Sequence, residues 1–107
     1  MQSFDAAALS NAYQDGTLTP ADVVEEVLAR IAVRGDDGVW LALAPRERLL
    51  EDARALQRRR AAGELMPLYG LPFAVKDNID VAGLPTTAAC PAFAYRPAAH
   101  AHAVRHL

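Results

Sequence analysis

The chain has 107 residues and a formal net charge of −2, from 11 basic and 13 acidic side chains. This length fits one small domain or part of a larger one. A slightly acidic chain argues against a nucleic-acid or anionic-membrane partner, because both require a net basic surface. No apolar run approaches the roughly 18 residues of a membrane span. Hydrophobic residues make up 52% of the chain and charged residues 22%, which is typical of a globular protein.

Cysteine usage and the N-terminal residues bear on the cellular compartment. Cys90 is the only cysteine, so the chain cannot form an internal disulfide. The N-terminus carries Asp5 and no early lysine or arginine, which is not the pattern of a secretory signal. We therefore expect a cytoplasmic protein.

The first 65 residues have the pattern of helices. Ser3 is expected to cap a short helix that ends near Gly16, because glycine readily adopts the left-handed conformation at a helix C-terminus. The apolar side of this helix consists of Phe4, Ala8, Leu9, Ala12 and Tyr13.

A stronger helix start follows at Thr19, with Pro20 at the first helical position and Asp22 at the third. Apolar residues then recur at helical spacing, which gives this helix one apolar face. The residues of that face are Val23, Val24, Val27, Leu28 and Ile31.

A short apolar run, residues 39–43, is expected to be a buried strand with Trp40 in the core. Pro45 then opens a third helix, which ends near Gly63. Three arginines, residues 58–60, lie in its last turn, where cations complement the helix dipole. A binding patch is the alternative role for this cluster. The apolar face of this helix consists of Leu49, Ala53 and Leu56.

Residues 66–107 differ in character, because glycine and proline interrupt them too often for long helices. Two extended pieces are expected, at residues 73–76 and 79–81. No acidic residue follows Asp80, and a stretch so poor in charge indicates backbone packed inside a larger body or lining a site. The elements do not complete a sheet with both faces covered, so we expect the N-terminal part of a longer protein.

Lys76 is the only lysine among 11 basic residues. It ends an apolar, strand-like run, and burial there would favour its neutral form, which a general base needs. The structural alternative is a lysine that extends from a strand end to solvent, or one that pairs with Asp77 or Asp80. Arginine could not serve as this base, because it does not lose its proton near neutral pH.

The string Tyr69-Gly70-Leu71-Pro72-Phe73-Ala74-Val75-Lys76-Asp77-Asn78 resembles the G-[IL]-P-x-x-[VIL]-K-D segment of the amidase signature family. The continuation D-N-I-D-V-A-G-L-P-T-T-A-A-C-P is similar to the allophanate hydrolase branch. The resemblance extends over essentially the whole chain. It implies an α/β fold in which residues 1–65 form an N-terminal helical segment. Residues 66–107 would begin the catalytic core, with the first strands of an α/β/α mixed sheet that is incomplete in this chain.

The resemblance also implies a mechanism. Lys76 would be the base of a Ser–cis-Ser–Lys triad that hydrolyses an amide such as allophanate to ammonia and carbon dioxide. The family needs no metal or organic cofactor. The implied partners are a small amide substrate, the remainder of the polypeptide, and a second copy in a homodimer.

The chain contains only one member of this triad. Its serines are Ser3 and Ser10, both in the first helical segment, whereas the family's catalytic serines lie in a glycine- and serine-rich stretch. We therefore expect these 107 residues alone to be inactive, and to be poorly soluble or partly unfolded. The alternatives are a related hydrolase of the biuret pathway, a transamidase subunit, or a non-catalytic truncated module.

Several other residues could carry chemistry but have structural explanations. Thr86 and Thr87 could shape a loop near the site, or they could satisfy backbone groups of a turn. Asp77 could orient Lys76 or accept from a backbone N–H. Cys90 has the surroundings of a small buried residue rather than a nucleophile. The three histidines, at positions 100, 102 and 106, are expected to be solvated or to face a partner.

Overall fold

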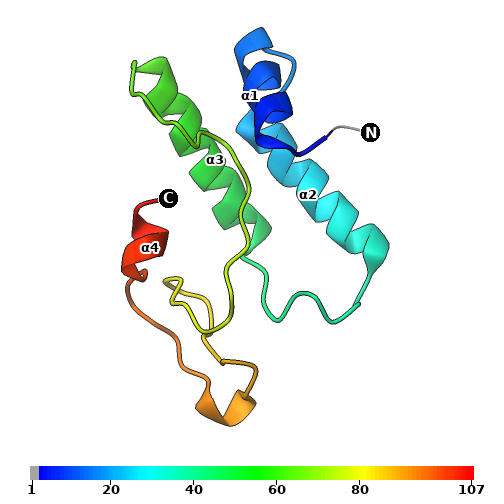
Figure 1. Ribbon diagram of the computed structural model, residues 1–107, viewed down its shortest axis with the longest axis vertical. Helices are drawn as coiled ribbons and strands as arrows, with labels where there is room; N and C mark the ends of the chain where they lie inside the picture. Colours follow the sequence, from blue (N-terminus) through cyan, green and yellow to red (C-terminus); the bar gives the residue numbers. More distant parts are fainter. Residues whose placement is uncertain (1–2) are drawn as a thin grey trace. The chain divides into compact units, whose positions relative to one another are not determined.

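The structure is a computed structural model that describes residues 3–107 and divides into two units. Unit 1 comprises residues up to Gly35 and residues 45–72, and it contains the three long helices. Unit 2 comprises residues 36–44 and 73–107, and it consists mainly of turns and coil (Figure 1). Within the described residues, no helix is both long enough and apolar enough to cross a membrane.

The first helix, α1, spans Ala6–Asp15. Asp5, rather than the expected Ser3, is its N-cap, and the Asp5 carboxylate accepts a hydrogen bond from a first-turn N–H at 2.8 Å. The Ser3 hydroxyl supports this cap by donating to the same carboxylate at 2.8 Å. Gly16 ends the helix with φ 75°, as expected for a left-handed C-cap.

The second helix, α2, spans Pro20–Arg34 and begins as the sequence predicts. The Thr19 hydroxyl accepts from the Asp22 N–H at 3.2 Å, and the Asp22 carboxylate accepts from the Thr19 N–H at 2.9 Å. This reciprocal pair satisfies two N–H groups that the helix itself leaves unbonded.

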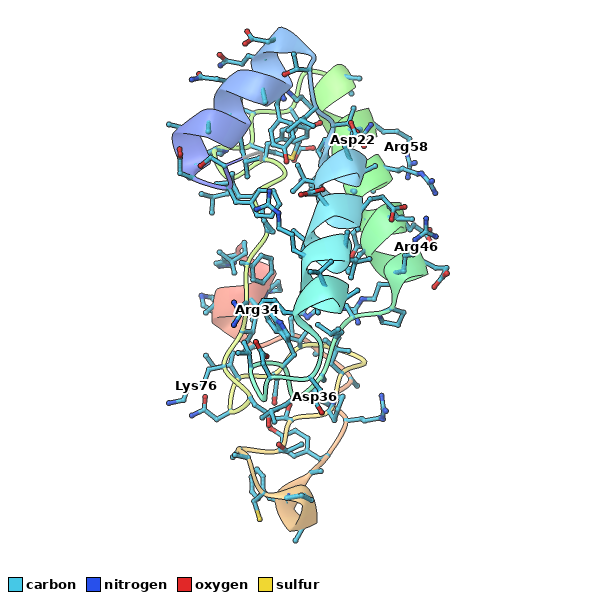
Figure 2. All side chains as sticks on the ribbon, turned by 90° about the vertical axis from the view of Figure 1, so that its right-hand side faces the viewer. Asp22, Arg34, Asp36, Arg46, Arg58 and Lys76 are labelled. Atoms are coloured by element: carbon cyan, nitrogen blue, oxygen red, sulfur yellow. The ribbon has the colours of Figure 1, made fainter. Side chains whose placement is uncertain are left out.

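The third helix, α3, spans Arg46–Ala61 and packs along α2, as both views show (Figures 1 and 2). Its buried residues, Leu50 and Ala53, are 5% and 4% exposed. The expected apolar face on this helix is therefore confirmed at Ala53. Pro45 precedes the helix as its N-cap residue, and no side chain accepts a hydrogen bond there.

The small core of unit 1 lies where α1, α2 and a returning segment meet. Its buried residues are Leu9, Tyr13 and Val23, all of which the helical pattern placed on apolar faces. The Tyr13 hydroxyl donates to the Gly70 carbonyl at 2.7 Å, and its ring meets that of Tyr69 edge to face at 5.3 Å. Residues far apart in the sequence are thus joined by one buried side chain.

The expected strands are not confirmed, since none forms at residues 39–43, 73–76 or 79–81 within the described residues. A strand requires a neighbouring strand to accept its backbone hydrogen bonds, and the described part of unit 2 offers these segments none. The β pairing that does form in unit 2 is a single antiparallel bridge between Thr86 and Tyr95.

Two short helical pieces complete unit 2. A 3₁₀ helix, η1, spans Pro91–Phe93, and α4 spans His102–Arg105. The helix expected near the end of the chain therefore forms as a single turn.

Large apolar side chains lie exposed in unit 2, contrary to the prediction of a buried strand with a core tryptophan. Trp40 is 41% exposed, and Leu41 beside it is 63% exposed. Phe73, at the start of the second expected strand, is 58% exposed. The reason is that the described part of this unit has no regular element broad enough to cover them.

Candidate functional site

Lys76 lies in unit 2, in a coil segment that follows Phe73 and leads into a turn. Its side chain is exposed and extends away from its own stretch of backbone (Figure 2). The expectation that it emerges from a buried strand is therefore wrong for the described residues. Among those residues, no ion pair or hydrogen bond involves its ammonium group.

Asp77, the next residue in the chain, is fully engaged with the loop that follows Pro85. Its carboxylate accepts from the Thr87 hydroxyl, from the Thr87 N–H at 3.2 Å and from the Ala89 N–H at 3.3 Å. Its backbone carbonyl accepts from the N–H groups of Thr87 and Ala88 at 3.2 and 2.9 Å. The expectation that Asp77 binds a neighbouring N–H is confirmed.

These bonds also set the ionisation of Asp77. The hydrogen bond from the Thr87 hydroxyl lowers the pKa of the Asp77 carboxyl, and the two N–H donors add to this effect against an opposing contribution from burial. The carboxylate form is therefore the one that the loop holds in place.

Asp80 is engaged in a second network of the same unit. Its carboxylate accepts from the Thr86 hydroxyl at 3.0 Å and from the Tyr95 hydroxyl. The bond to Asp80 raises the pKa of the Tyr95 phenol, because the phenol must keep its proton to donate. Thr86 is only 2% exposed, which makes it the buried polar residue of the described chain.

The two threonines thus bind the carboxylates that follow Lys76 in sequence, a role the sequence did not reveal. The expected contact with turn backbone is present as well, since the Thr87 hydroxyl oxygen accepts from the Ala89 N–H at 3.2 Å. Neither Asp77 nor Asp80 pairs with Lys76, so the structural alternative of a lysine–aspartate ion pair is not found among the described residues.

The loop held by Asp77 contains two residues with unusual backbone conformations. Ala88 and Ala89 have φ values of 50° and 60°, in the left-handed region that residues other than glycine seldom adopt. Hydrogen bonds from both N–H groups to Asp77 hold them there. A strained turn next to a candidate catalytic residue is a feature often associated with functional sites.

Cys90 is exposed, so its expected burial is wrong for the described chain. His100, the histidine nearest to it in sequence, instead accepts a hydrogen bond from the Ala82 N–H at 3.0 Å through Nδ1. The rings of His102 and His106 lie 4.2 Å apart, a contact that their spacing of four residues on a helix could have indicated. All three histidines are exposed, in agreement with the sequence.

The arginines at the end of α3 take part in local structure. Arg59 forms an ion pair with Glu64, just beyond the helix. The Arg60 guanidinium lies 4.4 Å from the centroid of the Tyr69 ring, as in a cation–π contact. These contacts support the structural role of the cluster over a binding patch.

A groove in unit 1 is lined by Arg60, Glu64 and Tyr69, among other residues. It has a volume of about 560 Å³ and lies between α1, the end of α3 and residues 63–71. Lys76 does not line it.

Comparisons with known proteins place these residues in a family. Residues 22–107 match the Amidase family. Urea amidolyase of Saccharomyces cerevisiae is 51% identical over 75 residues, which are 70% of this chain and 4% of that protein. A glutamyl-tRNA(Gln) amidotransferase subunit of Deinococcus radiodurans is 44% identical over 89 residues, which are 81% of this chain and 18% of that protein.

The chain spans only a small share of the curated relatives it matches. The corresponding amidotransferase subunit of Salinispora arenicola aligns with 100% of this chain at 38% identity, yet the match covers 22% of that protein. The resemblance to the amidase signature family is confirmed, and the similarity to two urea amidolyases agrees with the predicted allophanate hydrolase branch. Since the family match extends over far more than half of the sequence, this chain belongs to the Amidase family.

Proposed function

We propose that Lys76 is the general base of an amide hydrolase and that the chain supplies it to a longer polypeptide. The substrate we propose is allophanate. Support for the reaction class comes from the family match, which includes Lys76. Support for the substrate comes from the 51% identity to a urea amidolyase.

The observation that carries the proposal is the position of Lys76 in the string of residues 70–77, inside the residues that match the Amidase family. The structure adds that no carboxylate of the described residues forms an ion pair with Lys76. Here the two aspartates nearest in sequence, Asp77 and Asp80, are held by Thr87, Thr86 and Tyr95 instead. A general base accepts a proton, so the neutral amine of Lys76 is the form that the proposed reaction needs.

In the proposed reaction, the neutral amine of Lys76 takes a proton from a bridging serine elsewhere in the polypeptide. That serine deprotonates a second serine, which attacks the amide carbonyl and forms an acyl-enzyme. Backbone N–H groups hold the oxyanion, the leaving nitrogen takes the proton back through the serines and departs as ammonia, and water releases the acyl group. For allophanate, the acyl product is a carbamate that loses carbon dioxide. The described residues would contribute the base and its surroundings.

The wider architecture is part of the same proposal. Residues 66–107 would begin a catalytic core of α/β/α type, in which the exposed segments 39–43 and 73–76 gain strand partners from the rest of the polypeptide. A homodimer, a cytoplasmic location and independence from cofactors complete the proposal. The exposed apolar residues of unit 2, among them Leu41 and Phe73, support the need for such cover.

The test is substitution of Lys76 in the full-length protein. Lys76→Ala should abolish ammonia release from allophanate, because the methyl group of alanine cannot accept the proton. Lys76→Arg is the sharper variant, since it keeps the positive charge and the length but cannot lose its proton near neutral pH. We expect both variants to be inactive while their far-UV circular dichroism matches that of the parent.

Arg54→Ala, on the exposed face of α3, is the matched control that removes one cation and should retain activity. Near-normal turnover by Lys76→Arg would refute the assignment of Lys76 as the base. The 107-residue chain assayed alone should show no turnover, because its serines lie only at positions 3 and 10.

A second candidate is the amide-transfer reaction named for the amidotransferase relatives. Amide transfer is favoured by the larger share of this chain that aligns with an amidotransferase: 81% aligns with the Deinococcus protein and 70% with the yeast urea amidolyase. Both candidates use Lys76 in the same way. Comparing ammonia release from allophanate with amide transfer to glutamyl-tRNA(Gln) by the full-length protein separates them.

A further inference from the structure

Two features of unit 2 act on the same stretch of chain, residues 76–80. Thr87 binds the carboxylate of Asp77, and Thr86 binds that of Asp80. The two threonines are adjacent, and the turn after them is held in left-handed conformations at residues 88 and 89. Such a turn persists only when several bonds determine it together.

We propose that Thr87 is a positioning residue, which acts by keeping the Asp77 carboxylate away from the Lys76 ammonium. The Asp77 carboxylate is the negative charge closest to Lys76 along the chain. The structure gives this carboxylate three donors, all from residues 87 and 89. With its oxygens occupied on the side of the turn, it is not available to pair with Lys76.

The electrostatic consequence follows from the charges. A carboxylate within about 4–6 Å of an ammonium stabilises the protonated form, typically by the equivalent of about one pKa unit or more. A base that must be neutral is therefore weakened by a carboxylate partner. The Thr87 hydroxyl is the one side-chain donor among the three, since the other two are backbone N–H groups, so its removal is the most direct way to release that carboxylate.

The test labels the amines of the full-length protein and follows Lys76, which is the only lysine of these 107 residues. Amine-reactive reagents modify the neutral form alone, so the rate of Lys76 acylation at about pH 8 reports the neutral fraction. Peptide mapping by mass spectrometry separates Lys76 from the N-terminal amine. Thr87→Val, which keeps the shape and removes the hydroxyl, should slow acylation of Lys76 about tenfold, the equivalent of one pKa unit.

Three matched variants identify the cause. Thr87→Ser keeps the hydroxyl and should label at the parent rate. The double variant Asp77→Asn with Thr87→Val removes the freed charge and should also return to the parent rate. Thr17→Val removes a threonine hydroxyl that donates to the Ala12 carbonyl in unit 1, and it should have no effect.

The result that overturns the proposal is a Thr87→Val variant that labels as fast as the parent. A double variant as slow as Thr87→Val would overturn it too, because the Asp77 charge would then not be responsible. If Thr87→Val does not fold, Thr87→Ala removes the same hydroxyl with less bulk and takes its place.

This role rests on the proposed function of Lys76, but its test does not depend on turnover. In the full-length protein, Thr87→Val should also move the pH dependence of kcat to higher pH, whereas Asp77→Asn should not. If Lys76→Arg is active, the assignment of Lys76 as the base is refuted, but the labelling result for Thr87→Val still stands. If Lys76→Arg is inactive and Thr87→Val labels at the parent rate, only the proposed role of Thr87 is refuted.

Discussion

Gly70 is the position where one added methyl group should do most damage to unit 1. A Cβ built at Gly70 would lie 2.8 Å from Cε2 and Cζ of Tyr13 and 2.9 Å from Cγ of Pro20. All three distances are shorter than side chains tolerate. Gly70 also has φ +68°, a left-handed conformation that costs an L-residue about 1–2 kcal/mol.

The expected loss combines strain and overlap. Overpacking a buried contact typically costs about 1–3 kcal/mol. Tyr13 cannot turn away without losing the hydrogen bond from its hydroxyl to the Gly70 carbonyl, a bond that contributes about 1 kcal/mol. Gly70→Ala should therefore destabilise unit 1 by about 2–5 kcal/mol, which is a large part of the stability of a small domain.

The assay is urea denaturation followed by circular dichroism at 222 nm, since all three long helices belong to unit 1. Gly16→Ala is the matched control: Gly16 has φ +75°, and no atom lies within 4 Å of its added Cβ. It should show the strain alone, about 1–2 kcal/mol. Equal losses for the two variants would refute the reasoning, because the contact with Tyr13 and Pro20 would then contribute nothing.

Four further predictions concern the cap of α2, two aromatic side chains and the relative stability of the two units. Thr19→Ala removes the capping box of α2 and should lower the free energy of unfolding by about 0.5–2 kcal/mol in the urea assay, whereas Thr19→Ser should not. Burial raises the pKa of Tyr13 to about 12, above the value near 10 of an unfolded tyrosine. The folded state then holds this proton more tightly, so its stabilising contribution is complete below pH 10 and is lost as the pH rises from about 10 to 12. Tyr13→Phe should lack that part of the alkaline decline, and an unchanged decline would contradict the assignment. Trp40, which is 41% exposed, should emit as a solvated indole and be quenched by acrylamide; blue-shifted, quencher-resistant emission would show that it is buried. The isolated chain should exchange amide hydrogens faster in unit 2 than in unit 1, and a sharp cooperative melt of a monomer would count against this expectation.

The sequence was a sufficient guide to the helices because their signals are local. The capping residues Thr19 and Asp22 lie three positions apart, and Gly16 ends α1 through its own backbone freedom. The faces that carry Leu9 and Val23 follow from helical spacing alone. Each of these features depends on residues within a few positions of one another, so no knowledge of the fold was needed.

The strands were not predictable in this way. An apolar run such as residues 39–43 forms a strand only beside another strand, and the described part of unit 2 supplies none. The predicted burial of Trp40 and Cys90 is wrong for the same reason, since an apolar side chain is buried only when other elements cover it. Composition indicates that apolar side chains need other elements to cover them, but it does not say whether those elements are present.

The candidate site also has one part that the sequence predicted and one that it did not. The sequence by itself singled out Lys76, because it is the one lysine beside ten arginines and stands in a string typical of amidases. Of these two residue types, only lysine can lose its proton near neutral pH and act as a base. Only the tertiary structure decided where the neighbouring carboxylates go. Asp77 and Thr87 are ten positions apart, and a turn with two left-handed residues brings them together. Hydrogen bonds of that range depend on the path of the chain in space, which no pattern of residue types specifies.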